Sequence, residues 1–532
     1  MKKLSILIFL NLFFLFSLHA NEFTSDLKPL TKSSFKTKEA VINNLALKDG
    51  ENETLPLLLK SMIGGNLYYT KYKKEFVVVT KKEGKTYHIT DLMSGKTLDP
   101  VNKKMIKKVK TNNKLRSVIR TKLSQLTLFS KDSKKRYKAA KNILENLEPD
   151  SKELLDKALK NEKDTKVKNI LMEADTVLKA LYGNSEEQLK AIKDLGNFLS
   201  PTALQTLNKI KSNTEDKTLI ELCETSIESI ETSKSFYSVL ETAFFGLSQG
   251  SVLLLAAIGL AITFGVMKVI NMAHGEMMMI GAYTTFTLQQ IMPGLIEYSI
   301  FVAIPIAFIV AGLVGIIIER LVIQHLYGRP LETLLATFGV SLILQQLVRS
   351  IYGPLNQEVK TPQWMSGALE INSALSLTYN RLYIIIFAFI VFIGVLLVLK
   401  KTSLGLKVRA VTQNRQMAKA MGIKTGYIDA LTFGIGSGIA GIAGVALSQL
   451  TNVGPNLGQA YIVDSFMVVV FGGVGNLWGT LIGAVSLGEI NKFIEPVVGA
   501  VLAKVIILVF IIWFIQKRPR GLFPQKGRDA ED

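Results

Sequence analysis

The sequence predicts an all-α polytopic membrane helical bundle with a broken or re-entrant segment, preceded by an extracytoplasmic α+β domain that is mostly helical. Two observations lead to this prediction. The mean hydropathy is positive, at +0.29 over 532 residues. Charge is also unevenly distributed: residues 21–235 hold 41 Lys+Arg and 29 Asp+Glu, whereas the 297 residues from Phe236 onward hold only 20 and 14. Many apolar runs between these sparse charges reach the roughly 20 residues that a helix needs to cross a bilayer.

The composition excludes several classes of function. A net charge of +20 would suit a nucleic-acid-binding protein, but the tightest basic clusters flank apolar runs, where the positive-inside rule places them. The single cysteine, Cys223, cannot form an internal disulfide, and four scattered histidines do not suggest a metal site. The sequence contains no glycine loop of the Walker type, so any ATP chemistry belongs to another chain. We therefore expect no enzyme activity, no cofactor and no nucleic-acid partner.

Residues 1–20 have the features of a secretory signal peptide. Lys2 and Lys3 precede an apolar stretch, and Ser17-Leu18-His19-Ala20 is a candidate cleavage site. Leucine at the third position before the cut is less favourable than alanine, so an uncleaved anchor is the alternative. Both interpretations place the following domain outside the cytoplasm.

Residues 21–112 are predicted to contain a small antiparallel β-meander, since apolar and β-branched runs alternate with turn signals between Leu67 and Leu98. From residue 113 to residue 235 the apolar spacing changes to three and four, with breaks such as Glu148-Pro149-Asp150. Short amphipathic helices with short breaks indicate helical hairpins. A HEAT-like array and a plain helical bundle are both compatible with this spacing.

Residues 236–528 are predicted to form the membrane domain. Its apolar runs define spans near 239–267, 272–291, 299–323, 331–351, 380–400, 426–450 and 497–516. Residues 400–424 contain seven basic and no acidic residues, and residues 517–528 contain five basic and no acidic residues. Both segments are therefore expected in the cytoplasm, while the signal peptide places the N-terminal domain in the periplasm.

The number of spans requires an interruption between residues 461 and 489. If this region crossed the membrane once, the basic C-terminal tail would end on the outer side. The region must therefore enter and leave on one side or make two short crossings. Its glycines suit a broken helix that is buried in protein. They are Gly472, Gly473, Gly475 and Gly479.

Asn271, His274 and Glu276 follow the first predicted span. An ionisable group at membrane depth costs about 3 kcal/mol on insertion scales, so such groups usually face a polar interior. We expect these residues to line or gate a solute path, and the alternative is that His274 and Glu276 cap a helix at the interface. The glycines between Gly434 and Gly444 recur at small-xxx-small spacing, which predicts close helix packing, with substrate contact as the alternative.

A basic helix is predicted from residue 405 to Gly422. Its apolar residues recur at helical spacing, and its polar residues include Arg409, Gln413, Asn414 and Arg415. One interpretation is a coupling helix that docks on an ATP-hydrolysing partner, with Arg409 and Arg415 paired to carboxylates there. The other is a juxtamembrane helix that rests on anionic lipid.

Several segments resemble the permeases of branched-chain amino acid ABC importers, namely Leu260–Gly265, Asn271–Glu276 and Arg409–Val411. The urea-importer branch of these permeases is the closer resemblance. It is carried by Leu331–Thr337, Arg409–Arg415, Val453–Gln459, Tyr461–Val470 and Ile515–Pro519. The extended N-terminal region with its signal is also similar to that branch, although its Lys-rich sequence matches only loosely.

The resemblance implies a permease subunit of the inner membrane that imports urea, with branched-chain amino acids or short amides as the alternative. The partners that it implies are ABC ATPase subunits, a second permease subunit and a periplasmic substrate-binding protein. Two other classes stay open at this point. The first is an autonomous channel or secondary transporter, and the second is a sensor or docking module on a membrane anchor, although an anchor needs far fewer spans.

Overall fold

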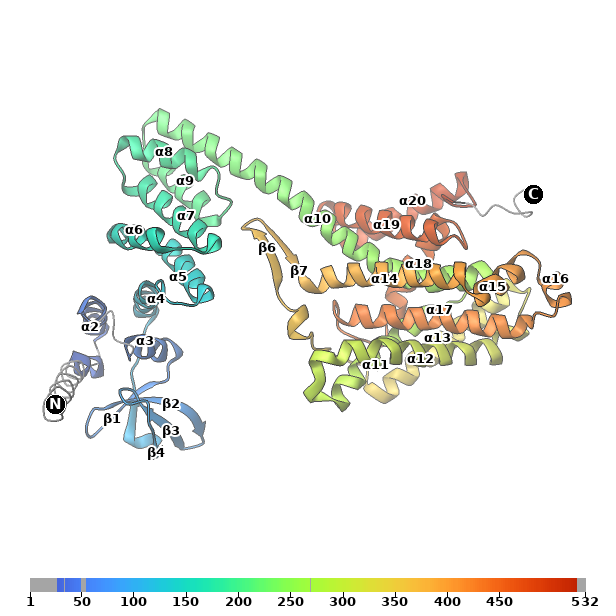
Figure 1. The fold of residues 1–532 in the computed structure, drawn as a ribbon, viewed down its shortest axis with the longest axis horizontal. Helices are drawn as coiled ribbons and strands as arrows, with labels where there is room; N and C mark the ends of the chain where they lie inside the picture. The colour runs from blue at the N-terminus through green and yellow to red at the C-terminus, as the bar shows by residue number, and fades with distance from the viewer. Residues whose placement is uncertain (1–25, 33, 49–53, 268, 524–532) are drawn as a thin grey trace, which may run out of the picture. The chain divides into compact units, whose positions relative to one another are not determined.

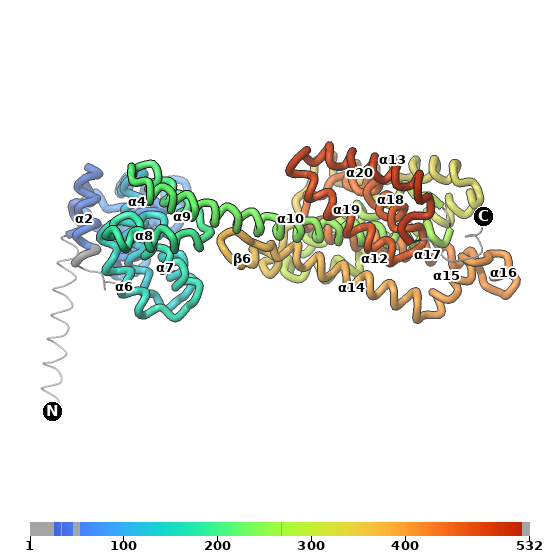
Figure 2. The backbone as a smooth tube through the Cα atoms, turned by 90° about the horizontal axis from the view of Figure 1, so that it is seen from above, coloured from blue at the N-terminus to red at the C-terminus, as the bar shows by residue number. Residues whose placement is uncertain are grey.

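The structure is a computed structural model that describes residues 26–32, 34–48, 54–267 and 269–523, so the predicted signal peptide at 1–20 lies outside the described residues. The chain divides into two compact units, Met1–Ser233 and Lys234–Asp532 (Figure 1). Helix α10 (Lys217–Met267) begins in the first unit and ends in the second (Figure 2). The predicted combination of a helical membrane bundle and a small N-terminal antiparallel sheet is confirmed.

The first unit contains a five-stranded antiparallel sheet in the order β4-β3-β2-β1-β5. Its elements are β1 (Leu67–Thr70), β2 (Phe76–Glu83), β3 (Thr86–Asp91), β4 (Thr97–Asn102), the short 3-10 turn η2 (Lys103–Met105) and β5 (Ile106–Lys108). Because side chains alternate along a strand, Leu67 and Tyr69 enter the main core, whereas Tyr68 joins a smaller cluster on the other face.

Four helical segments accompany the sheet: η1 (Lys28–Thr31), α2 (Phe35–Lys48), α3 (Thr54–Gly64) and α4 (Asn113–Thr127). Helix α3 contributes Leu55, Leu58 and Leu59 to the main core, and α4 contributes Leu115 and Ile119. Residue 113 was the expected boundary between the sheet region and the helical hairpins. Apolar side chains of α4 pack in the core beside the sheet, and α4 also packs on α5, so the boundary at residue 113 stays a prediction.

The rest of the first unit is helical and has a core of its own. Its elements are α5 (Ser133–Glu145), η3 (Pro149–Ser151), α6 (Lys152–Asn161), α7 (Thr165–Tyr182), α8 (Ser185–Leu195) and α9 (Pro201–Asn213). Side chains of Asp132, Asp164, Asn184 and Ser200 cap four of these helices, which satisfies backbone N–H groups that a helix leaves open. Helix α7 packs on α5, α6, α8 and α9. This neighbour packing suits stacked hairpins, and the HEAT-like array stays a prediction.

The second unit contains most of the apolar helices. They are α11 (His274–Ile291), α12 (Ser299–Leu321), α13 (Pro330–Tyr352), α14 (Tyr379–Lys401), α17 (Thr425–Ser448), α18 (Leu457–Gly472), α19 (Leu477–Val498) and α20 (Ala500–Lys517). Short elements join them: η4 (Pro293–Tyr298), η5 (Ile323–His325), η6 (Gln363–Met365), the hairpin β6 (Ala368–Asn372) and β7 (Leu375–Thr378), α15 (Ser403–Gln413) and α16 (Arg415–Ala420).

Among the described residues, six helices are long and apolar enough to cross a membrane: α10, the stretch around α12, α13, α14, α17 and α20. Helix α11 has almost the predicted bounds but is not one of them, because its polar residues lower its hydropathy. The apolar windows of α10 and α17 are 83% and 89% buried, whereas those of α14 and α20 are 22% and 17% buried. Helices α10 and α17 therefore form the centre, and the exposed apolar faces of α14 and α20 suit lipid.

Glycines allow α17 to contact its neighbours closely. A Cβ atom on Gly436, Gly441 or Gly444 would come closer than 3.0 Å to backbone atoms of α10, α12 and α11, respectively. The small residues of α17 thus serve helix packing, as their spacing predicted.

The interruption predicted between residues 461 and 489 is a tight helical hairpin of α18 and α19. The chain turns between them at Gly473 and Gly475, whose φ angles are 106° and 77°, values that L side chains rarely adopt. Gly472 and Gly479 face each other across the hairpin, and a Cβ on either would overlap the backbone of the other. The four predicted glycines therefore make the turn and the contact that hold this hairpin together.

Candidate functional site

Asn271 organises the turn between α10 and α11. Its side chain is 2% exposed, and its Oδ1 accepts a hydrogen bond from the backbone N–H of Ala273 at 3.0 Å. The next N–H, that of Met272, donates to Oγ1 of Thr337 in α13 at 3.1 Å. These bonds satisfy backbone groups just before α11 begins, so Asn271 stabilises the turn that leads into this helix.

His274 is fully buried at the first position of α11. Its Nε2 lies 3.0 Å from the carbonyl oxygen of Ala256 in α10. Because a carbonyl oxygen only accepts, Nε2 carries the proton and donates. A Cβ on Gly259 would lie 2.8 Å from the ring, so the imidazole fills the space between α10 and α11. Within the described residues, its Nδ1 has no hydrogen-bond partner.

Glu276 is 1% exposed and points to α13. Its Oε1 accepts two hydrogen bonds, from Oγ of Ser341 at 2.9 Å and from Nε2 of Gln345 at 2.8 Å. Its Oε2 is buried and has no hydrogen-bond partner among the described residues. The carboxyl group thus has one oxygen engaged by α13 and one oxygen available to a further donor.

The partners of Glu276 belong to a polar stripe on α13, defined as Thr333, Thr337, Ser341 and Gln345. The four residues recur every fourth position and are at most 3% exposed, which places them on one face of the helix. Large apolar side chains such as Leu335, Ile343 and Leu347 are exposed on other faces. The spacing of four was the signal that could have identified the whole stripe.

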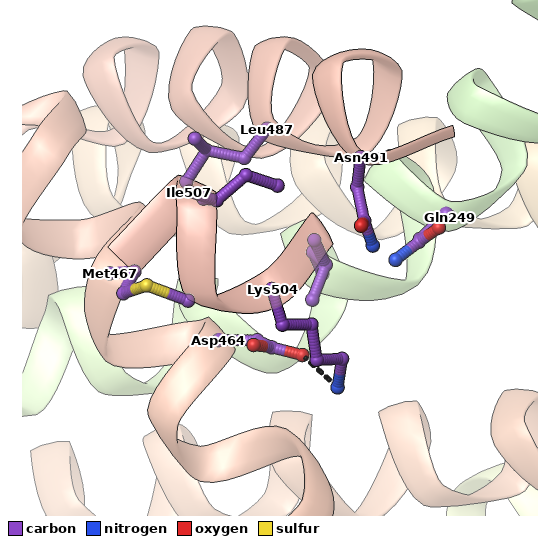
Figure 3. A pocket seen from close by; sticks show the side chains of 8 residues that line it. Gln249, Asp464, Met467, Leu487, Asn491, Lys504 and Ile507 are labelled. Carbon is purple, nitrogen blue, oxygen red and sulfur yellow. Dashed lines mark hydrogen bonds and ion pairs between the residues drawn. The ribbon is translucent and has the colours of Figure 1, made fainter. Parts of the chain in front are cut away.

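A second polar position lies between α10, α18, α19 and α20 (Figure 3). Nζ of Lys504 is 3.0 Å from Oδ2 of Asp464, and Gln249 and Asn491 lie beside this pair. The pocket is partly open, and its volume is about 10 Å³, which is room for about one water molecule. This pocket was not predicted, and it is too small to hold an organic solute.

The predicted basic helix is two helices, α15 and α16, with a break at Asn414. Oδ1 of Asn414 accepts a hydrogen bond from the N–H of Met417 at 2.9 Å and so caps the start of α16. Asparagine favours such cap positions over helix interiors, which explains why the predicted single helix does not continue. Gln413 is the last residue of α15. Gly422 follows α16 with a φ of 83°, as a glycine suited to a helix end would.

Both arginines of this segment make contacts within the chain. Nη1 of Arg409 donates to the carbonyl oxygen of Leu399 in α14. Arg415 forms an ion pair with Asp429 of α17 and lies over the ring of Tyr327. Arg415 is thus paired inside the second unit, and its pairing with a partner's carboxylate stays a prediction.

The apolar residues of the segment divide into two groups. Val408 and Val411 are buried against Ile428 of α17. Leu406, Met417 and Met421 are 62%, 61% and 77% exposed. The valines therefore attach the segment to the bundle, and the exposed leucine and methionines are the part that another protein could contact.

Comparison with known proteins places these features in context. Residues 242–515 match the family described as branched-chain amino acid transport system / permease component. The chain is 30% identical over 301 residues to the high-affinity branched-chain amino acid transport system permease protein LivH of Salmonella typhimurium, covering 54% of this chain and 97% of that protein.

Two further relatives give similar values. The permease protein BraD of Pseudomonas aeruginosa is 30% identical over 296 residues, covering 54% of this chain and 96% of that protein. A probable LivH of Methanocaldococcus jannaschii is 28% identical over 283 residues, covering 51% and 88%. No solved structure matches this chain.

Proposed function

Because the chain belongs to the branched-chain amino acid transport system / permease component family, we propose that it forms the membrane path of an ATP-driven importer for branched-chain amino acids. The chain is a multi-pass membrane protein and the permease component of an ABC transporter, not an enzyme. The proposed substrate is the one that the related permeases are named for, and these relatives are 30% identical over nearly their whole length.

Urea is the second candidate substrate. The relatives named above are permeases for branched-chain amino acids. Their similarity to this chain therefore does not favour urea as the substrate. One observation keeps urea open: more than 200 residues precede the family match, which begins at residue 242. An extended N-terminal region of this kind was part of the resemblance to urea-importer permeases.

The observation that supports a solute path is the polar stripe of α13. In a bilayer a polar helix face must be covered by protein or by a polar channel, and here it meets the carboxyl group of Glu276 between two apolar helices. Threonine, serine and glutamine offer neutral donors and acceptors, which suit a small polar solute. In this proposal Asn271 and His274 hold the turn that positions Glu276.

We propose that ATPase subunits dock on the exposed side of α15 and α16, and that a second permease subunit and a substrate-binding protein complete the complex. The buried valines and the Arg415–Asp429 pair hold this segment on α17. Movement of a docked ATPase would therefore reach the most buried helix of the bundle. Met417 and Met421, together with Leu406, are large apolar residues that the segment leaves exposed for such docking.

Uptake assays test the substrate. A strain that lacks this chain and regains it from a plasmid should recover ATP-dependent uptake of radiolabelled leucine, and unlabelled isoleucine should compete. Recovery of urea uptake alone would favour the second candidate. Uptake that persists after ATP depletion would instead indicate an autonomous channel and overturn the proposal.

Docking is tested by changing both exposed methionines to serine. The Met417→Ser/Met421→Ser variant should insert normally but should no longer co-purify with its ATPase subunits. Val497→Ser/Val501→Ser is the matched control, since these two valines are exposed beyond the segment, at 83% and 78%. If the methionine variant still co-purifies with the ATPase subunits, the segment does not dock on them through these residues. The alternative, a juxtamembrane helix that rests on anionic lipid, would then be favoured.

A further inference from the structure

The positive charge of the first unit is concentrated in its sheet region. Residues 71–122 contain 16 Lys+Arg and only 4 Asp+Glu, whereas residues 129–235 contain 19 of each. The family match begins at residue 242, so the permease function does not account for this asymmetry. A net charge of this density on about 50 residues produces a strong local field that attracts anions.

Backbone hydrogen bonds bring two turns of the sheet beside η2. The N–H of Lys71, at the start of the β1–β2 turn, donates to the carbonyl oxygen of Met105 at 3.0 Å. The N–H of Lys103 donates to the carbonyl oxygen of Lys85, in the β2–β3 turn, at 2.8 Å. The β1–β2 turn therefore lies beside η2, although more than 25 residues separate them in the sequence.

This juxtaposition creates a surface that we call the lysine tip. It consists of Lys71, Tyr72, Lys73, Lys74, Lys103, Lys104 and Met105, and all seven residues are exposed. Tyr72 is completely exposed and Met105 is 63% exposed, so neither side chain contributes to the core. One carboxylate, that of Glu75, lies in the same turn. The nearby Glu83 is already paired with Lys81 at 2.7 Å.

We propose that the lysine tip binds the anionic headgroup surface of a phospholipid bilayer, with Tyr72 and Met105 entering the interface. The five cations are all lysines, which act as point charges in a field, whereas site-specific phosphate recognition favours the bidentate fork of arginine. Tyrosine is enriched where a membrane meets water, because its ring is apolar and its hydroxyl group is polar. The same chain also carries helices long and apolar enough to span a membrane, so the first unit is tethered to a bilayer.

Several anionic partners could satisfy charge alone, and the apolar pair favours a membrane. A single-stranded nucleic acid would need a series of aromatic platforms for stacking, and the lysine tip offers one tyrosine. A methionine beside that tyrosine makes no favourable contact with a phosphate backbone. Its burial at the boundary between lipid headgroups and acyl chains would, in contrast, stabilise binding. This proposal does not depend on the substrate or the ATPase docking described above.

The affinity of the lysine tip for vesicles should depend on its positive charge and on the salt concentration. Each lysine near an anionic bilayer contributes about fivefold in affinity, so removal of five lysines should weaken binding by well over a hundredfold. Added salt should weaken binding in the same direction, because exposed charges are screened. Loss of the apolar pair should weaken binding but preserve its dependence on salt.

The test uses the full chain in neutral phosphatidylcholine nanodiscs, which cover its membrane helices, held on a sensor surface. Vesicles of phosphatidylcholine with phosphatidylglycerol should bind, and vesicles of phosphatidylcholine alone should not. The tip variant changes Lys71, Lys73, Lys103 and Lys104 to Gln and Lys74 to Asn, since Lys74 has a φ of 58° that asparagine adopts at low cost. The apolar variant is Tyr72→Ser/Met105→Ser.

The matched control removes the same charge from exposed positions of the helical part, namely Lys134, Lys135, Lys138, Lys141 and Lys190, each changed to Gln. The proposal requires that this control binds like the unchanged chain and that the tip variant does not. Equal loss by both variants, or unchanged binding of the tip variant, would overturn it. Tighter binding of duplex DNA than of anionic vesicles at the same salt would also overturn it. Circular dichroism should show the same secondary structure for the tip variant as for the unchanged chain. Variants that change only Lys71, Lys73 and Lys74, or only Lys103 and Lys104, should each lose part of the binding, which a general loss of folding would not produce.

Discussion

Arg415 forms an ion pair with Asp429, with 3.4 Å between Nη1 and Oδ1, and the same guanidinium group lies 4.5 Å from the ring centre of Tyr327. Asp429 is fully buried in α17. The hydroxyl group of Tyr327 donates to Oε1 of Glu319, in α12, at 3.1 Å. A chain of contacts thus connects α16 to two membrane helices, and it explains how a short surface segment keeps a defined position.

The two halves of this pair should differ in their contribution to stability. Arg415→Gln leaves a buried carboxylate without its cation and should destabilise the purified chain by about 3 kcal/mol. Asp429→Asn leaves an arginine whose side chain is 40% exposed and can be hydrated, so its cost should be about 1 kcal/mol. The Arg415→Gln/Asp429→Asn double variant should regain part of the loss. Additive effects in thermal melts would show that the pair is not coupled.

Glu276→Gln tests the charge in the path while preserving its shape. The amide oxygen can still accept from Ser341 and Gln345, so the fold and membrane insertion should be unchanged. Uptake should fall by at least about tenfold if the carboxylate contacts the moving solute, the loss expected from one missing charged hydrogen bond. Ser341→Ala, which keeps the carboxylate, should have a smaller effect. Unchanged uptake would make Glu276 a structural contact between α11 and α13.

Glycine-to-alanine changes test the packing of α17. Gly444→Ala would place a methyl group against the backbone of α11 and should cost about 1–3 kcal/mol in stability. Gly339 and Gly394 have open space around them, so Gly339→Ala and Gly394→Ala should be neutral or slightly stabilising. Melting temperatures of the purified variants give the comparison. Equal destabilisation at all these positions would argue against close packing as the cause.

The pH dependence of the first unit should reflect Glu173. This carboxyl group of α7 is buried and accepts a hydrogen bond from the Ser200 hydroxyl group, and burial raises its pKa. A raised pKa in the folded state favours the protonated form, so its stabilisation is present at low pH and is lost as the pH rises through that value. Glu173→Gln should raise the melting temperature at neutral pH and flatten its pH dependence. Glu145→Gln, on the exposed side of α5, should change neither.

Reporter fusions test the orientation. Alkaline phosphatase fused after Lys234 should be active, because the signal peptide is expected to export the first unit. The same enzyme fused after Gly527 should be inactive, because the basic C-terminal tail is expected in the cytoplasm. Activity at both positions, or at neither, would contradict the proposed orientation.

The extent to which the sequence predicted the site differs from residue to residue. Glu276 stood out because a carboxylate inside an apolar stretch is rare. The polar stripe on α13 was not predicted. Its residues recur every fourth position, a pattern that composition alone does not show. The break at Asn414 was missed, because the apolar spacing suggested one helix while the asparagine side chain capped a new one. Arg415 was identified as a functional cation, but its partner Asp429 could not be chosen over a carboxylate on another protein.

By itself, the sequence determined the class of this protein: hydropathy sets which segments can enter a bilayer, local alternation sets the meander, and glycines between 472 and 479 set the hairpin. These properties depend on neighbouring residues and therefore survive without a structure. Only the tertiary structure decided that Val408 packs inward while Met417 stays exposed, and that Lys71 lies beside Met105. Those outcomes depend on contacts between residues that are distant in the sequence. The sequence alone does not show which of these residues come together.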